Sequence, residues 1–126
     1  MDLYAVNMGT TNQLFQNNGD GTFTDIAGSK NADTGAGSDY PAVFFDIEGD
    51  GDLDLVVGYY SNAANKVLRW DGGGSGFTDV TSSAFVSGNA GSTQGAAACD
   101  YDGDGDLDAR QAFAFFQRKR CVCCLP

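Results

Sequence analysis

The sequence predicts an all-β protein built from repeated four-stranded antiparallel units, and three observations support this fold class. Similar segments recur 54 residues apart. Short runs of β-branched and aromatic residues alternate with turns rich in Gly, Asn, Asp and Ser, and no convincing helical period longer than ten residues occurs before residue 109. Because four-stranded units that recur at about 40–50 residues or slightly more are typical of propeller blades, we expect a fragment of a β-propeller.

The repeat runs through most of the chain with small changes of offset. Residues 23–26 match 77–80 at an offset of 54, residues 12–15 match 65–68 at 53, and residues 2–3 match 54–55 at 52. These slips require two one-residue insertions, one near Ala64 and one within residues 71–76. Both positions are rich in turn residues, so we expect the insertions to lengthen loops and to leave the strands intact.

The central copy contains four expected strands. They are Ala42–Phe45, Leu53–Tyr60, Lys66–Trp70 and Gly76–Val80. Apolar side chains on these strands form the expected core, namely Val43, Phe45, Leu55, Val57, Val67, Leu68, Phe77 and Val80. Trp70 is expected to pack between blades.

An acidic loop joins the first two strands of the central copy, and a second such loop lies 54 residues later. The first contains Asp46, Glu48, Asp50, Asp52 and Asp54, and the second contains Asp100, Asp102, Asp104, Asp106 and Asp108. Each loop thus places five carboxylates at alternate positions within nine residues. Like charges about 4 Å apart repel by roughly 1 kcal/mol per pair even in water, so both loops indicate a bound cation.

Calcium is the cation that this pattern favours. Carboxylates at loop positions 1, 3 and 5 can converge on Ca²⁺ if the chain turns sharply after the fifth, and Gly51 and Gly105 allow that turn. We expect two Ca²⁺ sites, each with side-chain ligands at positions 1, 3, 5 and 9 and a carbonyl ligand at position 7. The ligands are Asp46, Glu48, Asp50, Asp54 and the carbonyl of Asp52 in one loop, and Asp100, Asp102, Asp104, Asp108 and the carbonyl of Asp106 in the other. Hard oxygen donors disfavour zinc, copper and iron, and Mg²⁺ demands a stricter octahedron.

Two other interpretations of the loops compete with this one. An EF-hand shares the opening of the loop but requires a carboxylate at position 12 and flanking helices. Position 12 is Val57 in one loop and Gln111 in the other, and residues 55–60 have the composition of a strand. A solvated turn without a metal is the second alternative, and two copies at one period make it the weaker one.

The chain resembles the FG-GAP/VCBS repeat family, the blades of integrin α-chain head domains and of many bacterial surface proteins, over residues 2–108. The resemblance rests on the loop pattern D-x-[DE]-x-D-G-D-x-D and on Asn17–Asp25, which reads N-x-G-D-G-x-F-T-D. It implies integrin-α-like calcium-binding blades of an extracellular or cell-surface β-propeller that takes a protein or carbohydrate ligand in cell adhesion. The Phe-Gly and Gly-Ala-Pro signatures are absent, so integrin ligands are not implied.

Four segments are expected, and together they do not close a ring. Residues 1–26 are the last three strands of a partial blade, 27–80 one complete blade, 81–108 the start of a further blade, and 109–126 an aberrant basic, Cys-rich tail. Because a propeller closes on itself, the remaining blades of a parent chain are expected partners. No signal peptide is recognised. Because we expect the chain to start inside a blade, this absence does not indicate the compartment of the parent protein.

The tail departs from the repeat. Residues 110–126 carry four of the seven Lys and Arg and three of the four Cys, and no acid follows Asp108. We interpret the tail as a frame slip, an altered splice or a truncated gene product. Membrane contact by its aromatic and basic residues, or acylation or metal binding by Cys121, Cys123 and Cys124, are the alternatives.

The charge of the chain belongs mainly to the two loops. They hold ten of the 17 acids and no bases. The other seven acids balance the seven bases of the chain, so the net charge of −10 equals the charge of the two loops. No basic cluster outside the tail fits nucleic-acid binding, and no apolar run of 18 residues predicts a transmembrane segment.

These features predict a structural and adhesive calcium-binding module rather than an enzyme. The chain has no His and no Ser in a nucleophile elbow, and the clustered carboxylates already have ligand roles. We interpret Asp25 and Asp79 as hydrogen-bond acceptors in turns or between blades, not as a catalytic pair. The alternatives are the propeller portion of a secreted polysaccharide-acting enzyme and a truncated product without independent function.

Overall fold

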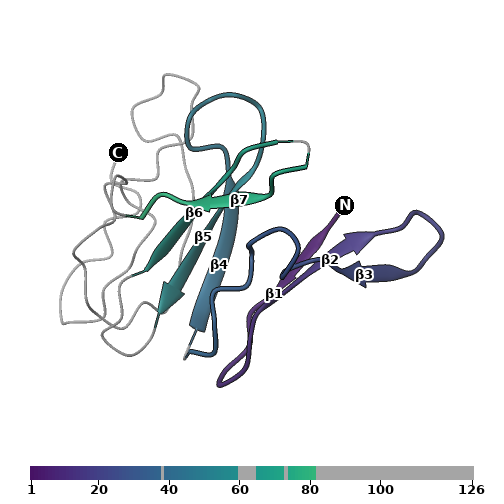
Figure 1. Cartoon of the computed structure of the whole chain (residues 1–126), viewed down its shortest axis with the longest axis horizontal. Helices are drawn as coiled ribbons and strands as arrows, with labels where there is room; N and C mark the ends of the chain where they lie inside the picture. Colours follow the sequence, from purple (N-terminus) through teal and green to yellow (C-terminus); the bar gives the residue numbers. More distant parts are fainter. Residues whose placement is uncertain (38, 60–64, 73, 82–126) are drawn as a thin grey trace, which may run out of the picture.

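A computed structural model describes residues 1–37, 39–59, 65–72 and 74–81, which contain strands and loops and no helix. The strands form two antiparallel sheets (Figure 1). The first sheet is β1 (Leu3–Ala5), β2 (Gln13–Asn17) and β3 (Phe23–Asp25), and the second is β4 (Asp39–Phe45), β5 (Asp54–Tyr59), β6 (Lys66–Trp70) and β7 (Phe77–Asp79), each in chain order. The predicted all-β class is confirmed, and the arrangement fits a fragment of a β-propeller. The second acidic loop and the tail lie outside the described residues.

The strands of the second sheet follow the sequence prediction closely, with one informative difference. β6 has the expected bounds, and β5 and β7 are each one residue shorter at both ends. β4 begins at Asp39 rather than Ala42 and passes through Pro41, where the pairing register with β5 shifts between Tyr40 and Ala42. Proline donates no ladder hydrogen bond, and the outer position of β4 in the sheet tolerates both the proline and the bulge.

Two buried asparagines hold equivalent turns of the two sheets. The side-chain oxygen of Asn12 accepts the N–H of Asn7 at 2.8 Å, and that of Asn65 accepts the N–H of Tyr59 at 3.0 Å. The bonded residues are five apart in the first sheet and six apart in the second. The extra residue of the second copy therefore lies between Tyr59 and Asn65, which agrees with the predicted place of the insertion near Ala64.

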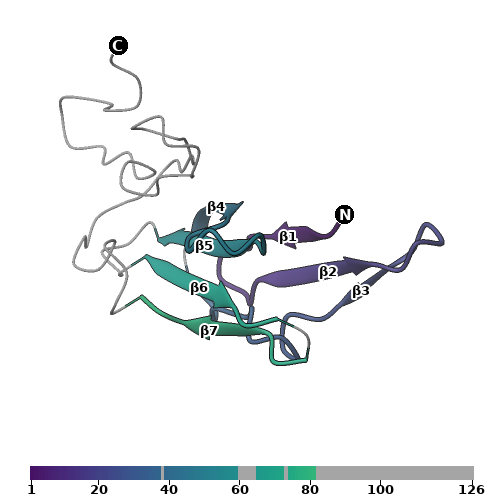
Figure 2. The same ribbon diagram turned by 90° about the horizontal axis from the view of Figure 1, so that it is seen from above.

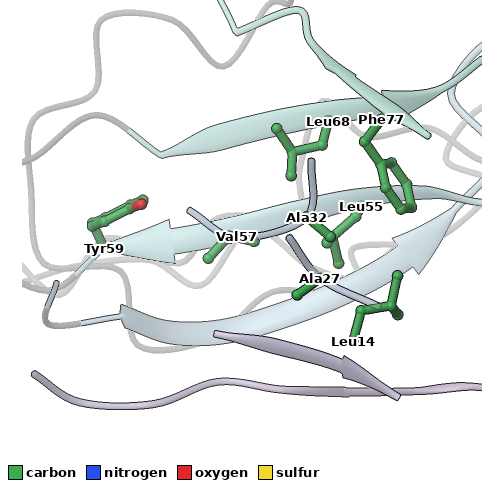
Figure 3. Close-up of a cluster of buried hydrophobic side chains, with 8 residues drawn as sticks. All are labelled: Leu14, Ala27, Ala32, Leu55, Val57, Tyr59, Leu68 and Phe77. Carbon is green, nitrogen blue, oxygen red and sulfur yellow. The ribbon is translucent and has the colours of Figure 1, made fainter. Parts of the chain in front are cut away.

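The core lies on both sides of β5, whose six residues are all buried. One face contributes to a cluster that joins the two sheets, made of Leu14, Ala27, Ala32, Leu55, Val57, Tyr59, Leu68 and Phe77 (Figure 3). The other face contributes Val56 to a second cluster with Phe45 and Val67. Among the predicted core residues, Val43 and Val80 are only partly buried and pack against this second cluster, and the other six are buried.

Aromatic side chains link the two sheets. The sheets lie side by side, and in both of them the strands follow one another in chain order in the same direction (Figure 2). Tyr4 of β1 meets Phe44 of β4 edge to face, with ring centroids 6.3 Å apart. Trp70 packs against the cluster that joins the sheets, and its ring lies 5.0 Å from that of Phe77. A mostly apolar hollow of about 500 Å³ remains between the sheets, lined in part by Leu14, Phe44 and Trp70. These contacts agree with the expected place of Trp70 between blades.

The segment after β3 docks on the β6–β7 hairpin through main-chain atoms. The carbonyl of Lys30 accepts the N–H of Phe77 at 2.8 Å, and the Lys30 amine lies 5.8 Å from the centre of the Trp70 ring. Gly76 has a φ of 81°, and a Cβ there would lie 2.5 Å from the Lys30 carbonyl oxygen. Only glycine fits this junction without a movement of the backbone.

We expect Gly76→Ala to lower the free energy of unfolding by about 2–4 kcal/mol, because overpacking costs roughly 1–3 kcal/mol and a left-handed φ about 1 kcal/mol more. Denaturant unfolding followed by the fluorescence of Trp70 measures this change. Gly72 also has a positive φ, 76°, but open space around its Cβ position, and Gly74 has neither constraint. Ala at Gly72 should therefore show the φ cost alone and Ala at Gly74 almost none. Equal stability of all three variants would show that close contact with Lys30 does not restrict position 76 to glycine.

Candidate metal-binding loop

The first acidic loop connects β4 to β5 and has both ends fixed in the core. Phe45 before it and Asp54 after it pair directly across the two strands, and they are 1% and 2% exposed. The sequence folds in this way because apolar strand residues flank the acidic stretch on both sides. The intervening carboxylates are consequently confined to one closed hairpin.

The backbone of the loop winds around the carboxylate of Asp46. Its Oδ1 accepts the N–H groups of Gly49 at 2.7 Å and Asp50 at 3.2 Å, and its Oδ2 accepts that of Gly51 at 2.7 Å. Gly49 and Gly51 have φ values of 74° and 92°, which confirms the sharp turn predicted at Gly51. The Gly51 N–H is the main cause of a lowered pKa for the Asp46 carboxyl, so Asp46 is a fixed anion inside the loop.

The remaining carboxylates of the loop tip are exposed to solvent. Asp50 accepts the backbone N–H of Asp52 at 3.0 Å through its Oδ1. The Oε1 of Glu48 lies 3.6 Å from Nε of Arg69, which belongs to β6. These side chains retain the freedom to reorient that a ligand-binding loop requires.

The charge on the loop is not fully balanced by this arginine. Loss of solvation raises the pKa of the Glu48 carboxyl, and the nearby charges of Asp54, Asp50 and Asp46 raise it further. The Arg69 guanidinium opposes this effect without reversing it. The direction of the shift means that the protonated form of the Glu48 carboxyl is favoured more than in free solution.

Asp54 has a structural role that the sequence analysis did not anticipate. Its Oδ2 accepts the N–H of Ile47 and its Oδ1 accepts that of Trp70, both at 2.8 Å. In the first sheet Asp2 occupies the equivalent position, and its Oδ1 accepts the N–H of Asn17 at 3.0 Å. The carboxylate thus joins the start of one strand to the end of the next in both sheets. The recurrence of Asp at positions 2 and 54 was the signal that could have revealed this role.

The donor set fits calcium in its chemistry, since it consists of carboxylates and backbone carbonyls. Within the residues that the structure describes, however, no three side chains of Asp, Glu, Cys or His gather around one metal position. Asp46 and Asp54 direct oxygens at backbone N–H groups, and Glu48 faces Arg69. A complete set of ligands therefore requires the exposed side chains to turn toward Asp46.

The second loop cannot be placed in the same way, because residues 82–126 lie outside the described part of the chain. Its expected ligands at Asp100, Asp102, Asp104, Asp106 and Asp108 stay predictions.

Asp25 and Asp79 make equivalent contacts inside their own sheets. In each, Oδ1 accepts the backbone N–H two residues further along at 3.0 Å. The Oδ2 of Asp25 accepts Nε2 of Gln13 at 3.1 Å, and that of Asp79 lies 3.3 Å from Nζ of Lys66. The interpretation of both residues as turn acceptors agrees with these contacts, which run within a sheet rather than between blades.

Comparison with known proteins identifies the family. The FG-GAP-like repeat matches residues 1–57 and 46–109, and the chain therefore belongs to this family. Both matched ranges contain the loop from Asp46 to Asp54. Cartilage acidic protein 1 of Xenopus tropicalis is 32% identical over 108 residues, a match that covers 85% of this chain and 16% of that protein. The chain is thus a repeat module that spans a small part of the length of its relative.

We expect Asp54→Ala to lower the free energy of unfolding by about 2–4 kcal/mol in the presence of a calcium chelator, because it leaves two partly buried N–H groups without acceptors. Denaturant unfolding measures the change, and the chelator separates it from any loss of metal. Asp52→Ala is the matched control, since Asp52 is exposed in the same loop. If the two variants unfold at the same denaturant concentration, the bonds to Ile47 and Trp70 are not structural.

The stability should also depend on the ionisation of Asp25. The N–H of Ala27 and then the side chain of Gln13 lower the pKa of its carboxyl below the usual 3.8. A folded-state pKa below the unfolded value stabilises the protein above about pH 4, and this contribution is lost as the pH falls through the folded pKa. Asp25→Asn keeps an oxygen acceptor but cannot titrate, so its free energy of unfolding should fall less between pH 5 and pH 2. Parallel pH profiles for the two proteins would contradict this.

Proposed function

We propose that the chain is a calcium-binding structural module of a larger extracellular β-propeller, in which each acidic loop holds one Ca²⁺. The observation that carries this proposal is the hairpin between β4 and β5. It confines five carboxylates to nine residues and winds its backbone around the anionic Asp46. Loss of solvation is the first cause of the raised pKa of Glu48, and the charges of Asp54, Asp50 and Asp46, which raise it further against the opposing Arg69, support the proposal.

The ligands in the first loop would be the side chains of Asp46, Glu48, Asp50 and Asp54 with the carbonyl of Asp52. The second loop would use Asp100, Asp102, Asp104 and Asp108 with the carbonyl of Asp106. The ion supplies positive charge that relieves the repulsion between carboxylates. An ion that binds only the folded loop stabilises it by about 2.7 kcal/mol at a hundredfold excess over Kd.

An extracellular setting is consistent with such sites, since extracellular calcium modules bind with Kd values of about 10⁻⁴–10⁻³ M. The Xenopus relative is named for cartilage and for its acidity. In the described part of the chain, no helix is long and apolar enough to cross a membrane. We propose a location outside the cell or at its surface for this chain.

The module would act by presenting loops rather than by catalysis. Asp25 and Asp79, the carboxylates that recur outside the acidic loops, are engaged within their own sheets as acceptors. In an assembled ring with the remaining blades, the exposed hairpins would contact a protein or carbohydrate partner in adhesion. FG-GAP-like membership supports a repeat module of this kind.

Isothermal titration of the full chain with CaCl₂ tests the proposal. We expect two ions per chain with Kd values in or below the millimolar range, one ion after Asp50→Asn, and one after Asp104→Asn. Asp33→Asn is the control, because it removes a negative charge from an exposed position outside both loops. Calcium should also raise the midpoint of thermal unfolding in the wild type. Failure to bind any calcium at millimolar levels, or two ions retained by Asp50→Asn, would overturn the proposal.

A further inference from the structure

Arg69 reaches the acidic loop from a strand that is not part of it. It is the penultimate residue of β6, opposite Thr78 of β7, and its Nε is 3.6 Å from the Oε1 of Glu48. Glu48 occupies the third position of the loop, one of the expected metal ligands. A positively charged side chain is thus placed beside a group that calcium would need.

The guanidinium is held in this place by the β6–β7 hairpin. Its Nε and Nη2 donate to Oδ1 of Asp71 at 2.9 Å and 2.6 Å. The other oxygen of Asp71 accepts the hydroxyl of Thr78 from the next strand. Because a fork bonded in this way loses mobility, Arg69 is held beside the loop although its side chain is 40% exposed.

This cation does not belong to the repeated pattern. The equivalent residue of the first sheet, at an offset of 53, is Gln16, which is uncharged. The strand pairing of the sheets does not therefore require an arginine here. Its contacts with Asp71 and Glu48 are specific to the blade that carries the described acidic loop.

We propose that Arg69 is an internal counter-cation that lowers the calcium affinity of the first loop, an inference that rests on the proposed calcium-binding function. In the metal-free loop Arg69 pairs with Glu48 and reduces the repulsion among the carboxylates. When calcium binds, Glu48 turns from Arg69 toward the ion, and two cations come to lie near each other. Arg69 therefore stabilises the metal-free loop and destabilises the calcium-bound one.

Calcium titration of Arg69→Gln tests this inference, in a chain that also carries Asp104→Asn so that uptake reports on the first loop. Removal of a charge close to a divalent ion is expected to tighten Kd by about three- to tenfold at low ionic strength, and by less at about 0.5 M salt. Arg69→Lys keeps the charge but loses the two-nitrogen contact with Asp71, so its Kd should lie between that of the Asp104→Asn chain and that of Arg69→Gln. Lys66→Gln is the matched control, because Lys66 lies on the same strand but pairs with Asp79.

A second readout separates this role from a merely structural one. Without calcium, Arg69→Gln should lower the midpoint of thermal unfolding, whereas the rise in midpoint on addition of calcium should become larger than in the parent. A purely structural arginine would lower the midpoint equally in both conditions. Arg69→Met retains much of the apolar stem and gives the same comparison if Gln impairs folding.

The outcomes distinguish this inference from the proposed function. If the Asp104→Asn chain binds calcium and the added Arg69→Gln leaves its Kd unchanged or raises it, the role of Arg69 is overturned and the calcium site is left intact. Tightening by Lys66→Gln to the same extent also overturns it, because the effect would then be one of net charge alone. If neither the wild type, nor the Asp104→Asn chain, nor any variant takes up calcium, the calcium site and the inference are refuted together.

Discussion

Burial of β5 on both faces is the constraint on which the rest of the structure depends. Leu55 and Val57 face the cluster between the sheets, whereas Val56 faces the opposite cluster. A shift of the strand by one residue would exchange these two sets, so the register with β4 and β6 is fixed. The acidic loop inherits this rigidity, because Phe45 and Asp54 at its ends are paired and buried. Like charges are therefore held close together by apolar packing that lies outside the loop.

Side-chain carboxylates and amides accept backbone N–H groups that the short strands of this chain leave without ladder partners. Strands of three to seven residues end in turns whose N–H groups have no partners in the ladder. Asp46, Asp54 and Asp25 accept these groups, and Asn12 and Asn65 do the same in the turns between strands. Part of the acidity of the chain is thus a requirement of the fold. The loop residues Asp46 and Asp54 accept backbone N–H groups in addition to their expected role as ligands.

The sequence predicted those features that are encoded locally. Strand positions, the turn at Gly51 and the insertion near Ala64 follow from short patterns, and the structure agrees with them. Features that depend on distant segments were not predicted. The burial of Val56 depends on what covers the second face of β5, and the bond from Asp54 to Trp70 joins residues 16 positions apart. The contact between Glu48 and Arg69 was missed for the same reason, since no local pattern specifies it.

Main-chain atoms make the hydrogen bond between Lys30 and Phe77, so this bond itself does not depend on the side chain of either residue. Glycine at position 76 is the condition that this contact imposes. Tandem copies joined in this manner can drift apart during evolution while their spacing and mutual tilt persist. At this junction the main-chain contact therefore leaves a lone glycine as its mark in the sequence.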